Sequence, residues 1–533
     1  MLLVCGVLAK ACSAGVLGVD AYVVQVEVDV SLGLPQYNLV GLADSAIKEG
    51  AVRVRAALEN SGFALPPRRV TVNLAPADVR KDGAAYDLPI ALALLVALEQ
   101  IPATALDGLL WLGELGLDGG LRRVAGSLPA ALFARQSGYQ GLVLPESCAR
   151  EAAAVRGLPV YAAQNLAQVV AALQQGQPLP RIAEIDAVAS AASAPTVDLL
   201  DVRGNEQPKR ALAIAAAGGH NLLFIGPPGT GKSMLARRLA GILPPLTESE
   251  AIESTAIYSA AGLLCGASLL AQRPFRAPHH DISAVGLVGG GSNPRPGEIS
   301  LAHHGVLFLD ELPEFPRAAL EALRQPLEDR TITIVRARCA VTYPASFSLV
   351  AAMNPCPCGF RGSSLRACVC DSGRIAQYMA RLSGPLLDRF DLHVEVPHVD
   401  YQTLLSEQRT GESSLKVREQ VMSAQKLQQA RSASLSQVAA SPSGSSGSGG
   451  FCANAALSAD QVVCLARPDA AGERLLLAYA QRHILSSRAV HRVLRVARTI
   501  ADLAGAAQVK APHVAEALSL RVLDRPLRSL ANA

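Results

Sequence analysis

The first part of the chain alternates apolar and polar positions as a half-buried strand does. Four valines are separated by three polar side chains: Val24, Gln25, Val26, Glu27, Val28, Asp29 and Val30. Apolar residues spaced three or four apart then predict a helix, which Asp44 or Ser45 can cap and Gly62 can end. Asp87 precedes an apolar run and is expected to cap a second helix. Strands and helices keep alternating, so residues 1–175 predict an α/β or α+β domain.

The remaining pattern divides into a linker, a strand-rich region and a helical region. Residues 176–196 are rich in proline, small and polar residues, which predicts a linker. Short apolar runs at 222–225, 306–309 and 348–353 predict buried strands. Farther on, an apolar stripe predicts a helix that begins after Ser486 and ends at Gly505. The Gly/Ser-rich segment 432–450 interrupts this helical region and is expected to be disordered.

Length, charge and cysteine content narrow the class of protein. A chain of 533 residues predicts three or four domains. The apolar run at 88–98 is too short to span a bilayer, and the N-terminus lacks the basic region of a signal peptide, so we expect a first strand and a cytoplasmic protein. Eleven cysteines, an odd number, favour reduced thiols. A net charge of +4 means that any nucleic acid must bind a local surface.

The segment GPPGTGKS fits the phosphate-loop pattern, with an apolar strand before it and a helix-forming run after it. Glycine N–H groups at a helix start can bind phosphate oxygens, Lys232 can reach the β- and γ-phosphates, and Ser233 can ligate Mg²⁺. The predicted nucleotide-binding residues are Gly226, Pro227, Pro228, Gly229, Thr230, Gly231, Lys232, Ser233 and Asp310.

Polar residues end the two later strands. Asp310, after the strand VLFL, is predicted to hold the magnesium shell with Ser233, and Glu311 to polarise the attacking water. Asn354 ends the strand at 348–353 and occupies a position that can touch both the γ-phosphate and the water. Together these residues predict a nucleoside triphosphatase.

Two arginines are candidates for contacts with the phosphates. Arg389, in SGPLLDRFD, suits a finger delivered to the nucleotide of a neighbouring subunit, and the alternative is a surface salt bridge. Arg488 begins the helix that Ser486 can cap and is a candidate lid arginine. Its alternative is membership of a basic face on that helix, formed with Arg492, Arg495 and Arg498.

Cysteines and histidines raise two metal hypotheses. Four thiolates suit tetrahedral Zn²⁺, and the alternative is a loop of reduced cysteines: Cys356, Cys358, Cys368 and Cys370. The paired histidines at 279–280 and 303–304 suggest a second metal site, but no carboxylate stands at ligand spacing, which favours structural roles.

These motifs carry a family resemblance along nearly the whole chain. The segment from RPFRAPHHDISAVGLVGGG to LEDRTITIVRA (273–337), together with NPCPCGF and SSRAVHRVLRVARTIADL, resembles the ComM/YifB family of magnesium-chelatase-like AAA+ ATPases. The resemblance implies an AAA+ core at 197–400 with inserts near 276–297 and 331–347, a helical lid at 401–533, ATP with Mg²⁺, and a hexamer. For ComM it implies a DNA helicase or branch-migration motor of homologous recombination during natural transformation.

The resemblance also bears on the first domain and on DNA. Residues 38–95 resemble the Lon-protease-like α+β domain of the family, but Ala84 and Ala85 stand where active Lon proteases have a serine. We therefore expect a scaffold or DNA-contacting domain and not a peptidase. Arg336 and Arg338 share one face of a predicted hairpin strand, and the family's hairpin lines a central pore, so both are candidate DNA contacts. The basic face near Arg495 is the next candidate. The alternative function is a chelatase-type ATPase that remodels a protein partner.

Overall fold

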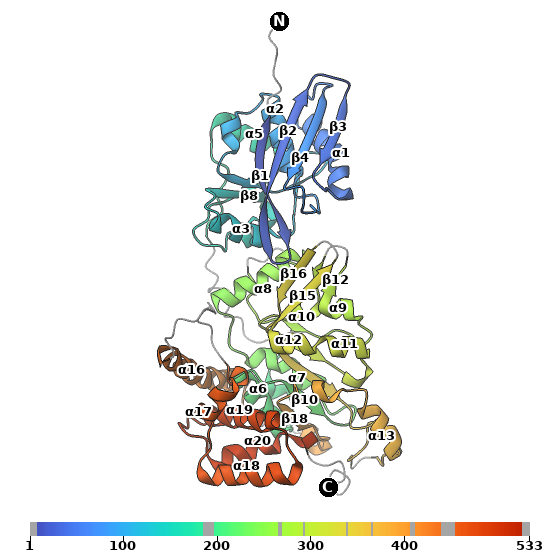
Figure 1. Cartoon of the computed structure of the whole chain (residues 1–533), viewed down its shortest axis with the longest axis vertical. Coiled ribbons are helices and arrows are strands. Elements are labelled where there is room, and N and C mark those ends of the chain that lie inside the picture. Colours follow the sequence, from blue (N-terminus) through green and yellow to red (C-terminus); the bar gives the residue numbers. More distant parts are fainter. Residues whose placement is uncertain are drawn as a thin grey trace.

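The computed structural model describes most of the chain, in two parts that lie end to end along its long axis (Figure 1). The described residues are 8–184, 197–264, 269–291, 294–336, 339–363, 366–405, 411–438 and 453–524. Within them, no helix is both long and apolar enough to cross a membrane.

The first domain is built on a mixed sheet. Its strands run in the order β3-β4-β2-β1-β5-β8-β9. Their bounds are β1 Ala9–Leu17, β2 Asp20–Ser31, β3 Gln36–Val40, β4 Arg69–Ala75, β5 Leu109–Trp111, β8 Gly141–Pro145 and β9 Val160–Ala163. The predicted alternating strand is the core of β2, because its even-numbered valines are buried. The helices are α1 Ser45–Asn60, α2 Asp87–Ala97, α3 Ser127–Gln136, α4 Glu146–Ala152 and α5 Leu166–Gln175.

Two expectations about helix caps have different outcomes. Asp44 caps α1, since its Oδ1 accepts a hydrogen bond from the Ile47 amide at 2.9 Å. Asp87 does not cap α2: it is the first helical residue and makes no capping hydrogen bond. Its buried carboxylate instead accepts from Arg53 Nε at 2.8 Å. Burial raises the pKa of Asp87 to about 6, and the arginine opposes this shift. The residue ties α1 to α2, a tertiary contact that the local sequence does not reveal.

The linker begins later than the composition predicts. The Ala162 amide donates to Pro180 O at 2.8 Å, and the Ile182 amide donates to Val160 O at 2.9 Å. Leu179, which precedes them, is buried in the core of the first domain. The chain just after residue 176 therefore lies along the edge strand β9, as part of the first domain. Residues 185–196 lie outside the described residues.

The second part contains a five-stranded, all-parallel sheet in the order β11-β14-β17-β10-β18. The strands are β10 Leu222–Ile225, β11 Phe275–Arg276, β14 Val306–Leu309, β17 Ser348–Met353 and β18 Leu392–Glu395. Every residue of β10 and β14 is buried, as expected for strands with both faces covered. Nearby helices include α6 Glu206–Gly218, α7 Lys232–Ile242, α8 Glu248–Ala260, α11 Arg317–Ala322 and α12 Arg324–Asp329. The predicted α/β class is confirmed.

The C-terminal region is helical and packs on the core. Its helices are α16 Ser414–Val438, α17 Ala459–Leu465, α18 Ala470–His483, α19 Ser487–Leu503 and α20 Ala511–Ser519. Ser486 caps α19 as predicted. α16 lies against α6 and α7, and its last seven residues, 432–438, are helical although the composition predicted disorder from residue 432. The rest of that segment, 439–450, lies outside the described residues.

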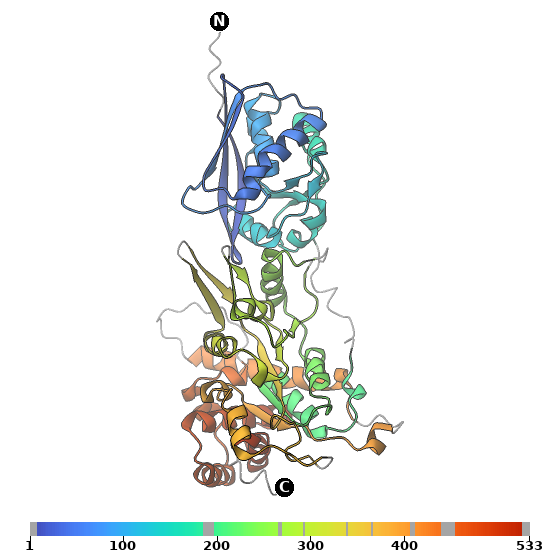
Figure 2. The same ribbon diagram turned by 90° about the vertical axis from the view of Figure 1, so that its right-hand side faces the viewer.

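Two hairpins lie where the core meets the first domain (Figures 1 and 2). They are β12 Gly289–Gly290 with β13 Arg295–Pro296, and β15 Thr331–Arg336 with β16 Cys339–Pro344. Gly18, in the β1–β2 turn, lies so close to the second hairpin that a Cβ there would be 2.5 Å from Val341 Cγ1. Beside it, the Gly126 amide donates to Ser259 O on α8 at 2.9 Å. The first domain is therefore docked on the core.

Candidate functional site: a nucleotide site and an arginine cavity on opposite sheet edges

The phosphate loop connects β10 to the first turn of α7. Gly229 and Gly231 have φ of +79° and +86°, which glycine adopts without strain. At Gly226 a Cβ would lie 2.3 Å from Val396 O, so only glycine fits there. Thr230 Oγ1 closes the loop by donating to Pro227 O at 3.0 Å. The loop therefore aims backbone N–H groups and the start of α7 at one point, a geometry that binds phosphate.

Lys232 lies inside this loop. Its ammonium donates to Gly226 O at 2.7 Å, to Pro227 O at 2.8 Å and to Asn354 Oδ1 at 3.2 Å. Burial lowers the pKa of Lys232 to about 8, against the opposing charges of Asp310 and Glu311. The negative charge of a triphosphate would act in the same direction as these carboxylates and favour the charged amine.

The predicted magnesium ligands contact each other. Ser233 Oγ donates to Asp310 Oδ2 at 2.5 Å, so the hydroxyl and the carboxylate converge on one side of the phosphate loop. Hydroxyl, carboxylate and phosphate oxygens are the ligands that Mg²⁺ prefers. The residues present therefore fit a magnesium ion carried by a nucleotide.

Glu311 follows Asp310 in a left-handed backbone conformation, with φ +53°, and its side chain is 57% exposed. Its Oε2 lies 3.6 Å from His280 Nδ1, which belongs to the loop before the short helix α9, Ala284–Val288, and the first hairpin. In the sequence, His280 stands out only as one member of the histidine pair at 279–280. A contact across thirty-one positions leaves no local pattern from which this partner could have been found.

The cysteine cluster lies on the phosphate loop. Three of its Sγ···Sγ distances are 3.4, 3.7 and 3.6 Å, and all four sulfur atoms lie within 4.8 Å of one another. The four residues are Cys356, Cys358, Cys368 and Cys370. Gly359, with φ +83°, lies against the loop, because a Cβ there would be 2.7 Å from Pro228 Cδ. The cluster thus stands directly beside Asn354 and the loop that holds Lys232.

Arg389 and Arg488 lie on the other edge of the sheet. Both line a cavity of about 1190 Å³ whose wall includes Asn221, Gly305 and Ser348, at the amino ends of β10, β14 and β17. The phosphate loop, Asp310 and Asn354 follow the carboxyl ends of the same strands. Strands of four to six residues rise about 3.3 Å per residue, so the two edges are more than about 10 Å apart. The structure brings the two arginines together but separates them from the phosphate loop of their own chain.

The supposed basic face of α19 is largely a set of structural contacts. Arg498 is 2% exposed and pairs with Asp502 at 2.9 Å. Arg492 donates to Phe390 O at 3.3 Å, and Arg495 donates to Leu457 O. Arg492 joins the lid to the core, whereas Arg495 and Arg498 bond to acceptors within the lid. These contacts weaken the three arginines as the second candidate for a DNA contact.

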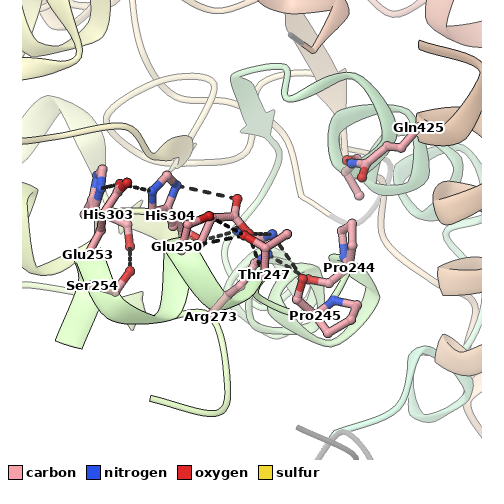
Figure 3. A network of polar contacts seen from close by, with 12 residues as sticks. Pro244, Pro245, Thr247, Glu250, Glu253, Ser254, Arg273, His303, His304 and Gln425 are labelled. Carbon is pink, nitrogen blue, oxygen red and sulfur yellow. Dashed lines mark hydrogen bonds and ion pairs between the residues drawn. The ribbon is translucent and has the colours of Figure 1, made fainter. Parts of the chain in front are cut away.

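The histidine pair at 303–304 belongs to a polar network with α8 (Figure 3). Glu253 Oε2 lies 3.3 Å from His303 Nε2 and 2.9 Å from His304 Nε2, so a carboxylate does accompany the pair. However, His303 Nδ1 accepts from the Ser346 amide at 3.0 Å, and burial lowers the pKa of His303. Neutral His303 therefore carries its proton on Nε2, which excludes that nitrogen as a metal ligand. The predicted structural role fits this geometry.

The hairpin residues lie near the first domain. Ile332 and Ile334 of β15 are buried, whereas Arg336 is exposed at the end of the strand and reaches over Gly290 of the first hairpin. Arg338 lies outside the described residues. The hairpin end therefore presents an exposed cationic group.

A phosphate loop, a carboxylate strand and a polar strand end on a parallel sheet, followed by a helical lid, define the class of P-loop ATPases with an AAA+ core. The family model described as magnesium chelatase, subunit ChlI, matches residues 198–404. The model described as subunit ChlI of Mg-chelatase matches residues 26–148, and the one described as magnesium chelatase, subunit ChlI C-terminal, matches residues 411–521. The chain belongs to the magnesium-chelatase-like ComM/YifB family, as its motifs predicted. This family implies ATP and Mg²⁺ as cofactors.

Individual relatives cover the whole chain. The chain is 44% identical to the competence protein ComM of Haemophilus influenzae, over 98% of this chain and 99% of that protein. It is 45% identical to YifB of Escherichia coli, over 96% of each. A more distant match, at 25% identity over 36% of this chain and 21% of the other, is the DNA replication licensing factor Mcm6 of Drosophila melanogaster.

Proposed function

We propose that this protein is an ATP-driven motor that acts on branched DNA as a hexameric ring, in homologous recombination during natural transformation. The observation that carries the proposal is the 44% identity, along the whole chain, to a protein named for competence. The partial match to a DNA replication licensing factor supports DNA as the track.

The two sheet edges support an assembly of several copies. Because Arg389 and Arg488 lie on the edge opposite the phosphate loop, they can meet a nucleotide only if a second copy presents one. A contact between the phosphate-loop side of one copy and the arginine-cavity side of the next is a head-to-tail interface. Such an interface closes into a ring when the rotation between neighbouring copies permits it. We therefore assign Lys232, Ser233 and Glu311 to the nucleotide of their own chain, and both arginines to that of a neighbour.

The experiment that tests the proposed function measures ATPase activity with and without branched DNA, together with migration of the branch. We expect stimulation and migration with branched DNA and Mg²⁺. The rival hypothesis, a chelatase-type ATPase acting on a protein partner, is favoured by the magnesium-chelatase family match. ATPase activity that is indifferent to every DNA structure would support that rival.

Replacing Arg336 and Arg338 together with alanine is expected to weaken DNA binding and flatten its salt dependence. In a plot of the logarithm of the DNA-binding constant against the logarithm of the salt concentration, the slope should change by about 0.9 for each phosphate contact that is lost, because fewer counterions are released. ATPase activity without DNA is measured in parallel. The matched control is Arg474→Ala, at an exposed arginine of α18. This helix of the C-terminal region lies at the opposite end of the molecule from the first domain (Figure 1). Unchanged DNA affinity in the double variant would exclude the hairpin as the track contact.

We also propose that the four cysteines hold a structural Zn²⁺. Zn–S bonds of about 2.3 Å in a tetrahedron place sulfur atoms about 3.8 Å apart. The three Sγ···Sγ distances, 3.4–3.7 Å, are close to this sulfur–sulfur separation and much longer than the roughly 2 Å bond of a disulfide. The ion would cross-link the two ends of the loop that lies on Pro228 and follows Asn354.

Purified protein is expected to contain about one zinc per chain by elemental analysis, given four ligands per ion. Replacing Cys368 and Cys370 with serine should remove the metal and lower the melting temperature, because metal binding contributes folding free energy. Cys464→Ser, at an exposed free cysteine elsewhere, is the control. If the purified protein contains no metal, and the cysteine variant keeps its melting temperature and ATPase activity, the four cysteines are ordinary thiols.

A further inference from the structure

Glu328 and Arg389 form an ion pair on the wall of the arginine cavity. Arg389 Nη2 donates to Glu328 Oε1, and both residues line the cavity. The arginine side chain is only 11% exposed, whereas that of the glutamate is 57% exposed. Arg389 Nε is buried and has no hydrogen-bond partner among the described residues. The guanidinium is therefore only partly satisfied by its own chain, and it retains a donor for a further acceptor.

The backbone at Arg389 is held in place. Asn221 Nδ2 donates to Arg389 O at 2.9 Å, and Asn221 Oδ1 accepts from the Leu349 amide at 2.9 Å. One side chain thus joins the segment before β18 to β10, which leads to the phosphate loop, and to β17, which leads to Asn354. With its backbone fixed to the sheet, Arg389 can change partner only through its side chain.

Glu328 stands at the base of the second hairpin. It lies in the last turn of α12, and Arg330 follows in a left-handed conformation, with φ +56°, directly before β15. The Ala345 amide donates to Arg330 O at 2.8 Å and closes the base of the hairpin. Arg330 and Ala345 line the same cavity as Glu328 and Arg389. A group that enters the cavity therefore meets the arginine and the hairpin base together.

On the basis of the proposed ring, we infer that Glu328 is a positioning residue that holds Arg389 against the hairpin base until the terminal phosphate of a neighbour's nucleoside triphosphate displaces it. A phosphate carries more negative charge than a carboxylate and accepts two parallel hydrogen bonds from a guanidinium. When Arg389 turns to the phosphate, Glu328 and the α12–β15 connection lose their anchor. Nucleotide binding in one copy is thereby transmitted to the hairpin of the next.

The test is Glu328→Gln in the full-length protein, which removes the charge and keeps the shape. Without a competing carboxylate, ATPase activity in the absence of DNA should rise about twofold to fivefold, the range that an exposed ion pair supports. Stimulation by DNA should fall by the same factor, because hydrolysis no longer depends on the hairpin. Glu328→Asp should restore the wild-type ratio. Glu321→Gln, which breaks an ion pair with Arg324 outside the cavity lining, is the matched control and should change neither rate.

The double variant Glu328→Gln with Arg389→Ala separates this role from a structural one. We expect it to match Arg389→Ala alone, because the glutamate acts only through the arginine. Unchanged or reduced DNA-independent activity in folded, assembled Glu328→Gln would overturn the inference, as would a rise that persists in the double variant. If Arg389→Ala alone leaves the ATPase activity unchanged, it is the proposed contact of Arg389 with a neighbour's nucleotide that is wrong. The failure of the inference about Glu328 and the failure of the proposed function are therefore distinguishable.

Discussion

Glu311→Gln is expected to bind ATP as wild type does and to hydrolyse it at least about a hundredfold more slowly, since a positioned general base contributes about 10²–10⁴ in rate. Glutamine keeps the shape of the side chain but cannot take a proton from water. Asp310 and Ser233, which contact each other at 2.5 Å, remain available for magnesium. Binding is measured with a fluorescent ATP analogue and turnover by phosphate release.

Two companion variants make this result specific. Lys232→Ala should lose ATP binding itself. The substitution removes the ammonium group, which three hydrogen-bond acceptors hold inside the phosphate loop. Glu314→Gln removes a carboxylate three residues farther on, where it pairs with exposed Arg381, and should hydrolyse ATP normally. Turnover near wild type in Glu311→Gln would show that another group activates the water.

The geometry of the candidate nucleotide site could be predicted because the residues that form it are local in sequence. Strand, glycine loop and helix start are contiguous, so Lys232 and Ser233 take their positions from backbone geometry alone. Asp310 and Asn354 follow apolar strands, and parallel strands place their carboxyl ends on one edge. Period-two and helical patterns also located β2 and the cap of α19.

The contacts that could not be predicted join residues far apart in the chain. Asp87 is predicted to cap a helix, but its partner in the fold is Arg53, thirty-four positions earlier. Glu328 and Arg389 are separated by sixty-one positions, which no periodicity spans. In both cases only the tertiary fold brings the charged partner close.

The docked first domain covers one side of the second hairpin. Val341 and Tyr343 are buried, and the β1–β2 turn lies against this strand, so one side of the hairpin is covered. The Lon-protease-like fold of this domain stays a prediction. Ala84 and Ala85 supply no serine nucleophile, and the contact with the hairpin favours a scaffold role for the first domain.

Arg389→Ala is expected to lower ATP turnover by about 10³-fold or more, the contribution of an arginine finger to phosphoryl transfer. The binding of ATP to the same chain should persist, because Arg389 lies on the sheet edge opposite the phosphate loop. Lys232→Ala has the complementary defect: its nucleotide site fails, but the arginine that it presents to a neighbour is intact. Separately purified, both variants should be nearly inactive.

Mixing the two variants tests whether the residues serve one pocket from two chains. If subunits exchange at random in an equal mixture, about a quarter of head-to-tail interfaces pair an intact phosphate loop with an intact Arg389. Phosphate release should therefore recover from nearly zero to a measurable fraction of the wild-type rate, and the fraction should depend on the mixing ratio. If mixed rings, verified with differently tagged subunits, stay inactive at every ratio, Arg389 and Lys232 do not act on one nucleotide from two neighbouring chains, and the assignment of Arg389 to a neighbour's nucleotide is wrong.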